Sequence, residues 1–461
     1  MKTITCDVAI IGAGSAGLAA YHSTVGAGAR TILIEAGPGG TTCARVGCMP
    51  SKLLLAASRA ARDMRAAGRF GVRTGGKPAI DGAAVMARVQ RERDHFVSEV
   101  LKDVAAIPRR DRLSGHARFT APGVLAVDDR VLVEARAIVI ATGARPMVPK
   151  ALAAACGERV LTHETVFDLP RLPKSLAVIG AGPLGLELAV AFARLGVRTN
   201  LFDHGQTFGG ARDPRVQAEV QAVLGRELDL NLGASIEARR KPGGNVAVTW
   251  TDPAGKTSHK AFEYLLSAAG RLPALDGLDL NMSGLEVDSA GVPVFDMETM
   301  RCGKSAIFIA GDADNARPVL HEAAAQGELA GRNAARLQKL ERRPPGVNLA
   351  MVYTDPDIAV VGDGFDPKKA KGWAIGCSDD NGRARVDGRD AGILVAYASR
   401  ADGVIVGGEF FGPDVEHLAH LLAWATQLKM TVGDALKLPF YHPTMEESLR
   451  SCLRDLRDNL G

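Results

Sequence analysis

The sequence has few cysteines for its length, and most of them are scattered. Its 461 residues contain seven cysteines, too few for a disulfide framework. Five of them are interpreted as ordinary thiols: Cys6, Cys156, Cys302, Cys377 and Cys452. The other two, Cys43 and Cys48, form a close pair, and such pairs in cytosolic proteins are more often catalytic or metal-binding than structural. No second pair at zinc-like spacing lies nearby, so redox chemistry is favoured.

The sequence also lacks a strong net charge and a membrane-spanning apolar run. A formal charge of +4 is small for this length and argues against a nucleic-acid partner. The apolar run from Leu176 to Ala193 is interrupted by glycines, Pro183 and Glu187, so it is predicted to be a strand, a turn and a helix. A strand follows Met1 closely, which leaves no room for a signal peptide. We therefore expect a cytoplasmic protein without membrane insertion, with roughly two to four domains.

The cysteine pair leads into a predicted helix. The segment from Leu53 to Ala61 is rich in Ala and Leu, and Pro50 suits a first helical position because its missing N–H has no partner to lose there. Cys48 is then expected at a helix N-terminus, where the dipole and the free N–H groups lower the pKa of a thiol. A structural disulfide or a pair of buried thiols is the alternative interpretation of Cys43 and Cys48.

A glycine-rich motif near the start of the chain predicts a dinucleotide site. It comprises Gly12, Gly14 and Gly17 after the predicted strand Asp7–Ile11, and Glu35 at the end of the predicted strand Thr31–Ile34. Such glycines permit a tight turn and close approach of a pyrophosphate to a helix N-terminus. The acid at the end of the second strand binds a ribose hydroxyl pair.

The same motif occurs a second time. It comprises Gly180, Gly182 and Gly185 after the predicted strand Leu176–Ile179, and Asp203 after the predicted strand Thr199–Phe202. The third glycine and the acid are eighteen residues apart in both copies. Two nucleotide sites are therefore predicted; the alternative is two Rossmann-like folds of which one no longer binds a nucleotide.

Later segments extend the predicted sites and begin a further domain. Buried strands are predicted before Thr142-Gly143 and before Asp312, and an acid at the end of a parallel strand faces the ligand crevice. A solvated loop aspartate is the alternative for Asp312. After a charged, Pro-rich break at 341–346 the pattern changes to short strands, followed by helices over Val415–Lys429 and Val432–Leu436.

The C-terminal region contains a candidate general base. His442 precedes Pro443, and Glu447 follows near the start of a predicted amphipathic helix. A lone His before Pro is usually a surface loop residue. A carboxylate at this spacing can instead orient the imidazole for proton transfer.

Taken together, these motifs make the sequence similar to the pyridine nucleotide–disulfide oxidoreductases, and within them most similar to dihydrolipoamide dehydrogenase. The resemblance covers the full length and includes CxxxxC followed by Pro-Ser-Lys between two dinucleotide motifs, and a C-terminal His-Pro-Thr-x-x-Glu. It implies an α/β fold with two Rossmann-like dinucleotide-binding domains, for FAD and NAD, and a C-terminal α+β dimerisation domain. The implied segments are 1–147 (first part of the FAD domain, with the redox disulfide), 148–269 (NAD domain), 270–345 (second part of the FAD or central domain) and 346–461 (dimerisation domain).

The resemblance also implies roles for individual residues. FAD would be bound by Gly12, Gly14, Gly17, Glu35, Lys52, Thr142, Gly143 and Asp312, and NAD by Gly180, Gly182, Gly185, Asp203 and Gly270. Lys52 and Glu187 correspond to an ion pair near the flavin and nicotinamide rings. Cys48 would be the flavin-proximal cysteine, Cys43 the one that meets substrate, and His442 the base oriented by Glu447. No metal site is implied.

The implied activity is oxidation of protein-bound dihydrolipoyl groups through a Cys43–Cys48 disulfide and FAD to give NADH. His442 would deprotonate the dihydrolipoyl thiol, because the thiolate is the species that attacks a disulfide. In the family this histidine reaches the disulfide of the other subunit, so a homodimer is implied, with a lipoylated carrier protein or dihydrolipoamide as partner. Asp203 favours NAD, because a carboxylate accepts the ribose 2′-hydroxyl and repels a 2′-phosphate.

Two alternatives stay open. One is an NAD(P)H-dependent reductase of another disulfide, a quinone or a metal ion; the other is a non-catalytic flavoprotein subunit of a multienzyme complex. The usual dihydrolipoamide dehydrogenase pattern is not followed at Thr41, Arg45, Asp355, Phe440 and Tyr441. These departures indicate either a protein specialised for one lipoylated carrier or neutral drift.

Overall fold

The computed structural model describes residues 1–73, 75–76, 78–389 and 391–460. Its internal contacts separate two units, each assembled from several segments of the chain. Unit 1 comprises Met1–Met49, Arg91–Pro146 and Arg271–Pro345, and unit 2 comprises Pro50–Gln90, Met147–Gly270 and Gly346–Gly461. The two units are described separately below.

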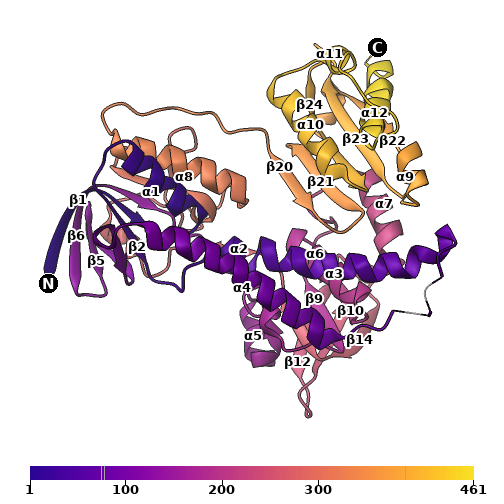
Figure 1. Ribbon diagram of the computed structural model, residues 1–461, viewed down its shortest axis with the longest axis horizontal. Coiled ribbons are helices and arrows are strands. Elements are labelled where there is room, and N and C mark those ends of the chain that lie inside the picture. Colours follow the sequence, from indigo (N-terminus) through magenta and orange to yellow (C-terminus); the bar gives the residue numbers. More distant parts are fainter. Residues whose placement is uncertain (74, 77, 390, 461) are drawn as a thin grey trace. The chain divides into compact units, whose positions relative to one another are not determined.

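Unit 1 is built on a nine-stranded sheet (Figure 1). Its centre is β1 (Lys2–Ile11), which pairs in parallel with β2 (Thr31–Glu35) and β6 (Val131–Ile140). The buried ends of these strands are continuous apolar runs, as expected where a parallel sheet is covered on both faces. The other strands are β3 (Arg112–Ser114), β4 (Ala117–Ala121), β5 (Val124–Val127), β17 (Phe295–Asp296), β18 (Arg301–Cys302) and β19 (Ile307–Ile309).

Two helices pack together beside this sheet. α1 (Ser15–Gly26) and α8 (Leu320–Ala335) lie side by side in Figure 1, and small buried residues such as Ala20 and Ala330 belong to the core that they share with the sheet. The chain leaves β1, β6 and β19 at the same edge, where the carboxyl ends of parallel strands meet. α2 (Thr42–Val46) and a short antiparallel ribbon, β7 (Ala144–Pro146) with β16 (Arg271–Pro273), complete unit 1.

Unit 2 contains a five-stranded parallel sheet. As in unit 1, a central strand leads through a glycine loop into a helix. The strand order is β11-β10-β9-β15-β8, and all neighbouring strands are parallel. These strands are β8 (Val160–Leu161), β9 (Ser175–Ile179), β10 (Arg198–Asp203), β11 (Asp229–Leu232) and β15 (Tyr264–Ser267), and α5 (Lys150–Cys156), α6 (Pro183–Arg194) and α7 (Pro214–Leu224) accompany them. An antiparallel sheet of β12 (Ser235–Arg240), β13 (Val246–Thr251) and β14 (Thr257–Phe262) adjoins it.

The last part of unit 2 is an antiparallel sheet covered by helices. Its order is β20-β21-β24-β23-β22, with bounds β20 (Leu349–Val352), β21 (Asp357–Gly362), β22 (Trp373–Ser378), β23 (Ile393–Ser399) and β24 (Ile405–Gly412). The helices are α9 (Gly382–Val386), α10 (Val415–Gln427), α11 (Val432–Ala435) and α12 (Glu446–Asp458). α12 buries Leu449, Cys452, Leu453 and Leu456, the spacing of an amphipathic helix.

Two long helices, α3 (Cys48–Ala66) and α4 (Gly82–Ala106), pass from one unit into the other along the chain. α3 begins at Cys48, so Pro50 is its third residue rather than its first. Proline is tolerated there because N–H groups of the first turn have no intrahelical partner.

The fold class predicted from the sequence is confirmed: the chain is mixed α/β, with two sheets whose central parallel strands lead into glycine loops and a C-terminal α+β region. Leu176–Ala193 is a strand, turn and helix as expected. The predicted helix ending at Lys429 is shorter and ends at Gln427, because Lys429 has a φ of +53°, which a helix cannot contain. The domain boundaries predicted from the sequence stay predictions.

Candidate active site

One hydrogen bond joins the first glycine loop to Glu35, the predicted ribose acid. Glu35 Oε2 accepts a hydrogen bond from the N–H of Ala13 at 2.6 Å, and Oε1 accepts one from Gly37 at 2.6 Å. Gly12 has a φ of +104°, and a Cβ there would lie 2.3 Å from the carbonyl oxygen of Ala141. A Cβ on Gly14 would meet no atom within 4 Å. Position 12 therefore requires glycine because a side chain would clash with the protein backbone, whereas the space beside Gly14 is open.

The residues around this loop fit a dinucleotide. The buried hydroxyl oxygen of Thr142 has no hydrogen-bond partner among the described residues, which is costly unless a ligand provides one. Gly143 next to it has a φ of +71° and open space above its Cα. Asp312, at the edge where β19 ends, lies 2.5 Å from a guanidinium nitrogen of Arg271. The loop, the unpartnered hydroxyl and the open space together fit a dinucleotide, as predicted for FAD.

The second glycine loop in unit 2 repeats this arrangement. Asp203 Oδ2 accepts a hydrogen bond from the N–H of Ala181, and Oδ1 accepts one from Gly205. A Cβ on Gly180 would lie 2.2 Å from the carbonyl oxygen of Ala268, while one on Gly182 would meet nothing within 4 Å. The open space at the middle glycine fits a second dinucleotide.

Two further glycines of the motifs are packed tightly. A Cβ on Gly17 would lie 1.8 Å from the carbonyl oxygen of Gly12, and one on Gly185 would lie 1.9 Å from that of Gly180. These third glycines allow α1 and α6 to approach their loops closely. Gly270, the last predicted NAD residue, follows β15, and its carbonyl oxygen accepts a hydrogen bond from Met147.

The two cysteines lie on consecutive helices of the chain. Cys43 belongs to α2 and is partly buried, whereas Cys48 is exposed and is the first residue of α3. The chain turns back at Gly47, where a Cβ would lie 3.0 Å from the carbonyl oxygen of Thr42 and 3.3 Å from Cys43 Cα. Thr41, one of the departures from the usual pattern, caps α2 because its hydroxyl accepts a hydrogen bond from the N–H of Ala44. Cys48 therefore has the helix N-terminal position that favours a thiolate.

Lys52 and Glu187 form an ion pair in unit 2. Lys52 Nζ donates to both carboxylate oxygens of Glu187 at 2.8 Å. The Glu187 side chain is 4% exposed and that of Lys52 is 38% exposed. The ammonium nitrogen also lies 4.5 Å from the centre of the Tyr353 ring, a cation–π distance. The predicted pairing is present, while its role in a reaction stays a prediction.

His442 and Glu447 also contact each other. The His442 Nδ1 lies 2.9 Å from Glu447 Oε2 and 3.1 Å from Oε1. This hydrogen bond from His442 lowers the pKa of Glu447 below its usual value, so the carboxylate is ionised at neutral pH. The His442 side chain is 81% exposed. Its second ring nitrogen is consequently available to a group outside this segment.

The predicted site residues thus fall into local groups. Unit 1 contains the first glycine loop, Thr142, Asp312 and the two cysteines, and unit 2 contains the second glycine loop, Lys52–Glu187 and His442–Glu447. The other cysteines differ from Cys48 in that most are buried. Burial raises the pKa of Cys6 to about 11 and that of Cys302 to about 12, which agrees with inert thiols.

An apolar surface lies beside His442. Leu421, Trp424, Leu428, Leu438 and Tyr441 line one groove and are all exposed side chains. Trp424 is 62% exposed and Leu428 73%. Large side chains of this type gathered in one place are typical of a protein interface.

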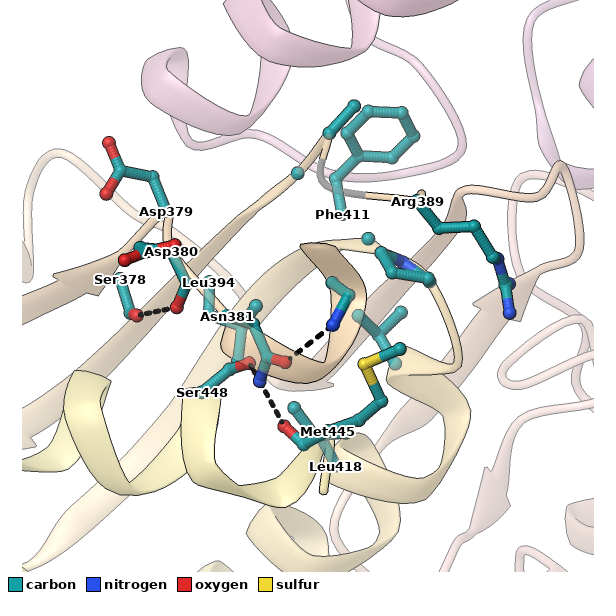
Figure 2. Close-up of a pocket in the computed structure, with 16 residues that line it drawn as sticks. Ser378, Asp379, Asp380, Asn381, Arg389, Leu394, Phe411, Leu418, Met445 and Ser448 are labelled. Carbon is teal, nitrogen blue, oxygen red and sulfur yellow. Dashed lines mark hydrogen bonds between the residues drawn. The ribbon is translucent and has the colours of Figure 1, made fainter. Parts of the chain in front are cut away.

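A second pocket lies between β22, α9 and α12 (Figure 2). Figure 2 shows Asn381 at its centre, and this side chain accepts a hydrogen bond from the N–H of Ala384 and donates one to the carbonyl oxygen of Met445. None of the predicted site residues lines this pocket. The hydrogen bonds of Asn381 join α9 to the start of α12, so we assign the pocket a structural role.

Comparison with known protein families agrees with this geometry. A model described as pyridine nucleotide-disulphide oxidoreductase matches residues 6–327, and a model of the dimerisation domain of the same family matches residues 349–452. The chain belongs to this family. Members of the family use FAD and NAD(P)H, so the predicted cofactors are confirmed at the level of the family.

The individual relatives are named for different activities. A dihydrolipoyl dehydrogenase of Bacillus subtilis is 29% identical over 97% of both chains. A mercuric reductase of Streptomyces lividans is 30% identical over 96% of this chain and 94% of its own length. The solved structure of a Cu(II) complex of the HOCl-induced flavoprotein disulfide reductase RclA from Escherichia coli has a TM-score of 0.83 at 21% identity, covering 98% of this chain and 99% of that one.

These comparisons show that the protein is a flavoprotein disulfide oxidoreductase. The predicted resemblance to the family is confirmed, and the dimerisation domain supports the predicted homodimer. Within the described part of the chain, no helix has the length and apolar character needed to cross a membrane.

Sequence reasoning missed two residues of the site. Tyr353 covers Lys52 and donates its backbone N–H to Glu187 at 3.1 Å, and Arg271 pairs with Asp312. Both had weak signals: Arg271 directly follows Gly270, and Tyr353 is two residues before the unusual Asp355. Neither signal indicates which partner the residue contacts in the fold.

Proposed function

We propose that the protein is an NAD-dependent dihydrolipoamide dehydrogenase. The observation that carries this proposal is the His442–Glu447 pair, in which the carboxylate holds Nδ1 at 2.9 Å and leaves the imidazole exposed. A dithiol substrate needs a base for its thiol, since the thiolate is the attacking species. An oriented imidazole is the usual base for that task near neutral pH.

The other side chains have complementary roles. In this proposal His442 takes the proton of the first substrate thiol, and the resulting thiolate attacks Cys43. The attack breaks the Cys43–Cys48 disulfide and forms a mixed disulfide between the substrate and Cys43. The second substrate thiol then attacks the substrate sulfur of that mixed disulfide, which releases the oxidised cyclic disulfide and leaves Cys43 and Cys48 reduced by two electrons. Cys48, at the start of α3, is held as a thiolate by the helix terminus.

The nucleotide sites support electron transfer from the reduced cysteines. FAD bound at the first glycine loop supplies a two-electron acceptor and NAD⁺ at the second supplies a hydride acceptor. In this proposal Lys52 and Glu187 fix the local charge beside these rings. Asp203 selects NAD⁺, because its carboxylate would repel a ribose 2′-phosphate.

Steady-state oxidation of dihydrolipoamide tests the proposal. The purified protein, loaded with FAD, is supplied with dihydrolipoamide and either NAD⁺ or NADP⁺, and reduced nucleotide is measured by absorbance. We expect NADH formation at least about tenfold faster than NADPH formation, as charge repulsion of roughly 1.4 kcal/mol would give. Absence of turnover with dihydrolipoamide would contradict the substrate class, and equal use of both nucleotides would contradict the role of Asp203.

A reductase of another disulfide or of a metal ion is the second candidate. The relative named mercuric reductase has an identity similar to that of the dihydrolipoyl dehydrogenase, and both activities would use the cysteine pair. Oxidation of NADH with oxidised glutathione, a quinone, Hg²⁺ or Cu²⁺ in place of oxidised lipoamide distinguishes the two candidates. Faster turnover with any of these than with lipoamide would favour the second one.

A non-catalytic role as a subunit of a complex is distinguished by Cys48→Ser. We expect this variant to lose turnover almost completely while it keeps bound FAD. Retention of every cellular role by Cys48→Ser would favour the non-catalytic alternative.

A further inference from the structure

The Lys52–Glu187 pair is supported from a segment far away in the sequence. Glu187 Oε1 accepts a hydrogen bond from the backbone N–H of Tyr353 at 3.1 Å, in addition to the Lys52 ammonium. The Tyr353 ring covers the same ammonium at 4.5 Å. A buried carboxylate requires such partners to stay ionised. The geometry of the pair therefore depends on where the segment 353–357 is held.

Asp355 attaches this segment to α3. Its carboxylate is buried, and Oδ2 lies 3.0 Å from Arg59 Nε and 2.7 Å from Arg62 Nη2. Arg62 also donates from Nη1 to the backbone carbonyl oxygen of Asp355 at 2.7 Å. Arg59 and Arg62 lie on the same helix as Lys52, two to three turns further along it.

The same segment is also attached to α6, the helix of Glu187. Arg194 donates from Nη1 to the carbonyl oxygen of Thr354 at 2.7 Å and from Nη2 to that of Asp355 at 2.8 Å. Arg194 lies about two turns after Glu187 on α6. The two helices that carry the ion pair are thus joined through one short loop.

A third arginine completes the surroundings of Asp355. Arg389 Nη2 lies 3.0 Å from Asp355 Oδ1, and the same guanidinium pairs with Asp414. Figure 2 shows Arg389 at the edge of the pocket, with its guanidinium group directed away from Asn381. Burial alone would raise the pKa of Asp355, but Arg62 and Arg389 hold that pKa below its usual value.

We propose that Asp355 is a positioning residue for the Lys52–Glu187 pair, because its charge gathers Arg59, Arg62 and Arg389 around the loop that holds Glu187. The proposal rests on the proposed function only for what the ion pair contributes to the reaction. Loss of the charge removes the carboxylate that Arg59, Arg62 and Arg389 share, so the attachment of the loop to α3 is weakened. Lys52 then loses the covering Tyr353 ring and its fixed position against Glu187.

Chemical labelling of Lys52 in the FAD-loaded, full-length protein tests this. Limiting acetic anhydride acetylates lysines whose amine is available, and peptide mass spectrometry gives the rate at Lys52 relative to Lys437, whose side chain is 77% exposed. In Asp355→Asn we expect the relative rate at Lys52 to rise about fivefold, as expected when charge-assisted contacts are lost. Asparagine tolerates the φ of +50° at this position, so backbone strain does not account for the change.

Asp414→Asn is the matched control, because it removes a carboxylate from Arg389 without touching α3 or α6. We expect the labelling of Lys52 in this control to equal that of the parent protein. An unchanged rate in folded Asp355→Asn, or an equal increase in both variants, would overturn the proposal. If Asp355→Asn cannot be obtained folded, Arg62→Gln replaces it, with an expected rise of about twofold, and a parental rate there overturns the proposal equally.

The same variants distinguish a failure of this positioning proposal from a failure of the proposed function. If the positioning role is correct, turnover in Asp355→Asn falls along with the rise in labelling, and Asp414→Asn retains parental turnover. If the parent protein has no dihydrolipoamide activity, the proposed function fails, while the labelling of Lys52 still decides whether Asp355 positions the pair.

Discussion

The orientation of His442 in the candidate site depends on its contact with Glu447. His442 is highly exposed and would rotate freely without Glu447, whose two oxygens both lie within 3.1 Å of Nδ1. The contact fixes the ring and supplies a negative charge to stabilise the imidazolium formed when a proton is taken. Both residues belong to one short segment of the chain, so the contact between them is local in the sequence.

Glu447→Gln is expected to lower dihydrolipoamide turnover by about 10- to 100-fold, within the usual contribution of general acid–base catalysis. The amide keeps a hydrogen bond but provides no charge for the imidazolium. Reduction of the bound FAD by NADH, followed by absorbance in a stopped-flow instrument, should be unchanged because it does not involve this base. Glu446→Gln is the matched control. Equal losses in both variants, or slower reduction by NADH in Glu447→Gln, would contradict the assignment.

Asp357 gives a prediction for the pH dependence of stability. Burial raises its pKa to about 7, and the charges of Asp355 and Glu416 add to this while Arg59 opposes it. The folded protein therefore holds a proton that the unfolded chain, with an aspartate pKa of about 4, releases. Stability contributed by the neutral carboxyl is present at low pH and is lost as pH rises from about 4 through about 7.

Asp357→Asn removes this loss, because an amide is neutral at every pH and its oxygen can still accept the hydrogen bond from the N–H of Asp355. We expect Asp357→Asn to raise the unfolding temperature, relative to the parent protein, by several degrees more at about pH 8 than at about pH 5. A pKa shift of about three units corresponds to at most roughly 4 kcal/mol of unfolding free energy. Circular dichroism during heating measures the unfolding temperature, with the exposed Asp458→Asn as control. An equal change at both pH values would contradict the raised pKa.

At the level of elements, the two glycine loops are built on one plan. In each, a Cβ on the first glycine would meet a carbonyl oxygen just after a neighbouring strand, and the middle glycine faces open space. The acid at the end of the next strand accepts one hydrogen bond from an N–H of the glycine loop and one from the N–H two residues after the acid. The protein therefore closes both loops in the same way. The contacts of the protein do not by themselves require glycine at the middle position, so a requirement for glycine there would come from the nucleotide.

Gly182→Ala separates ligand binding from folding. A Cβ there meets no protein atom within 4 Å, so we expect unchanged thermal stability but a KM for NADH raised about tenfold or more, because the methyl group occupies space needed by the pyrophosphate. Steady-state kinetics and thermal unfolding measure the two effects. Gly372→Ala, also in open space, is the control. An unchanged KM would mean that the nucleotide does not approach this loop.

The contrast between local and distant contacts explains what the sequence could predict. Glycine loops, the acids after them and His442 with Glu447 were predictable, since each is defined within about 25 residues of chain and by strict backbone requirements. Tyr353 and Asp355 were not, because their partners Glu187, Arg59 and Arg62 lie more than 160 residues away. Helix ends such as Gln427 also depended on the conformation of the following loop.

For the whole molecule, the apolar surface beside His442 is the feature that a dimer would bury. A family dimerisation domain spans this region, and the exposed side chains of Trp424 and Leu428 are large enough to act as central contacts. The proposed reaction needs this interface, since His442 would serve the cysteines of the other subunit.

Trp424→Glu is therefore expected to weaken the dimer about tenfold or more, the effect of losing one major interface residue. Sedimentation velocity over a range of protein concentrations measures dissociation, and dihydrolipoamide turnover should fall as monomers form, while FAD stays bound. Met64→Glu, which replaces an exposed methionine of α3, is the control. A Trp424→Glu protein that remains fully dimeric would contradict the assignment of this surface.

The His442–Glu447 pair is complete within one chain, and this allows two inactive subunits to restore each other. A chain with Cys48→Ser still provides a working base, and a chain with His442→Ala still provides a working cysteine pair. Refolding the two together should give about a quarter of the parental activity, because about half of randomly formed dimers are mixed and each mixed dimer has one intact site. Such subunit complementation would show directly that each active site is shared by two chains.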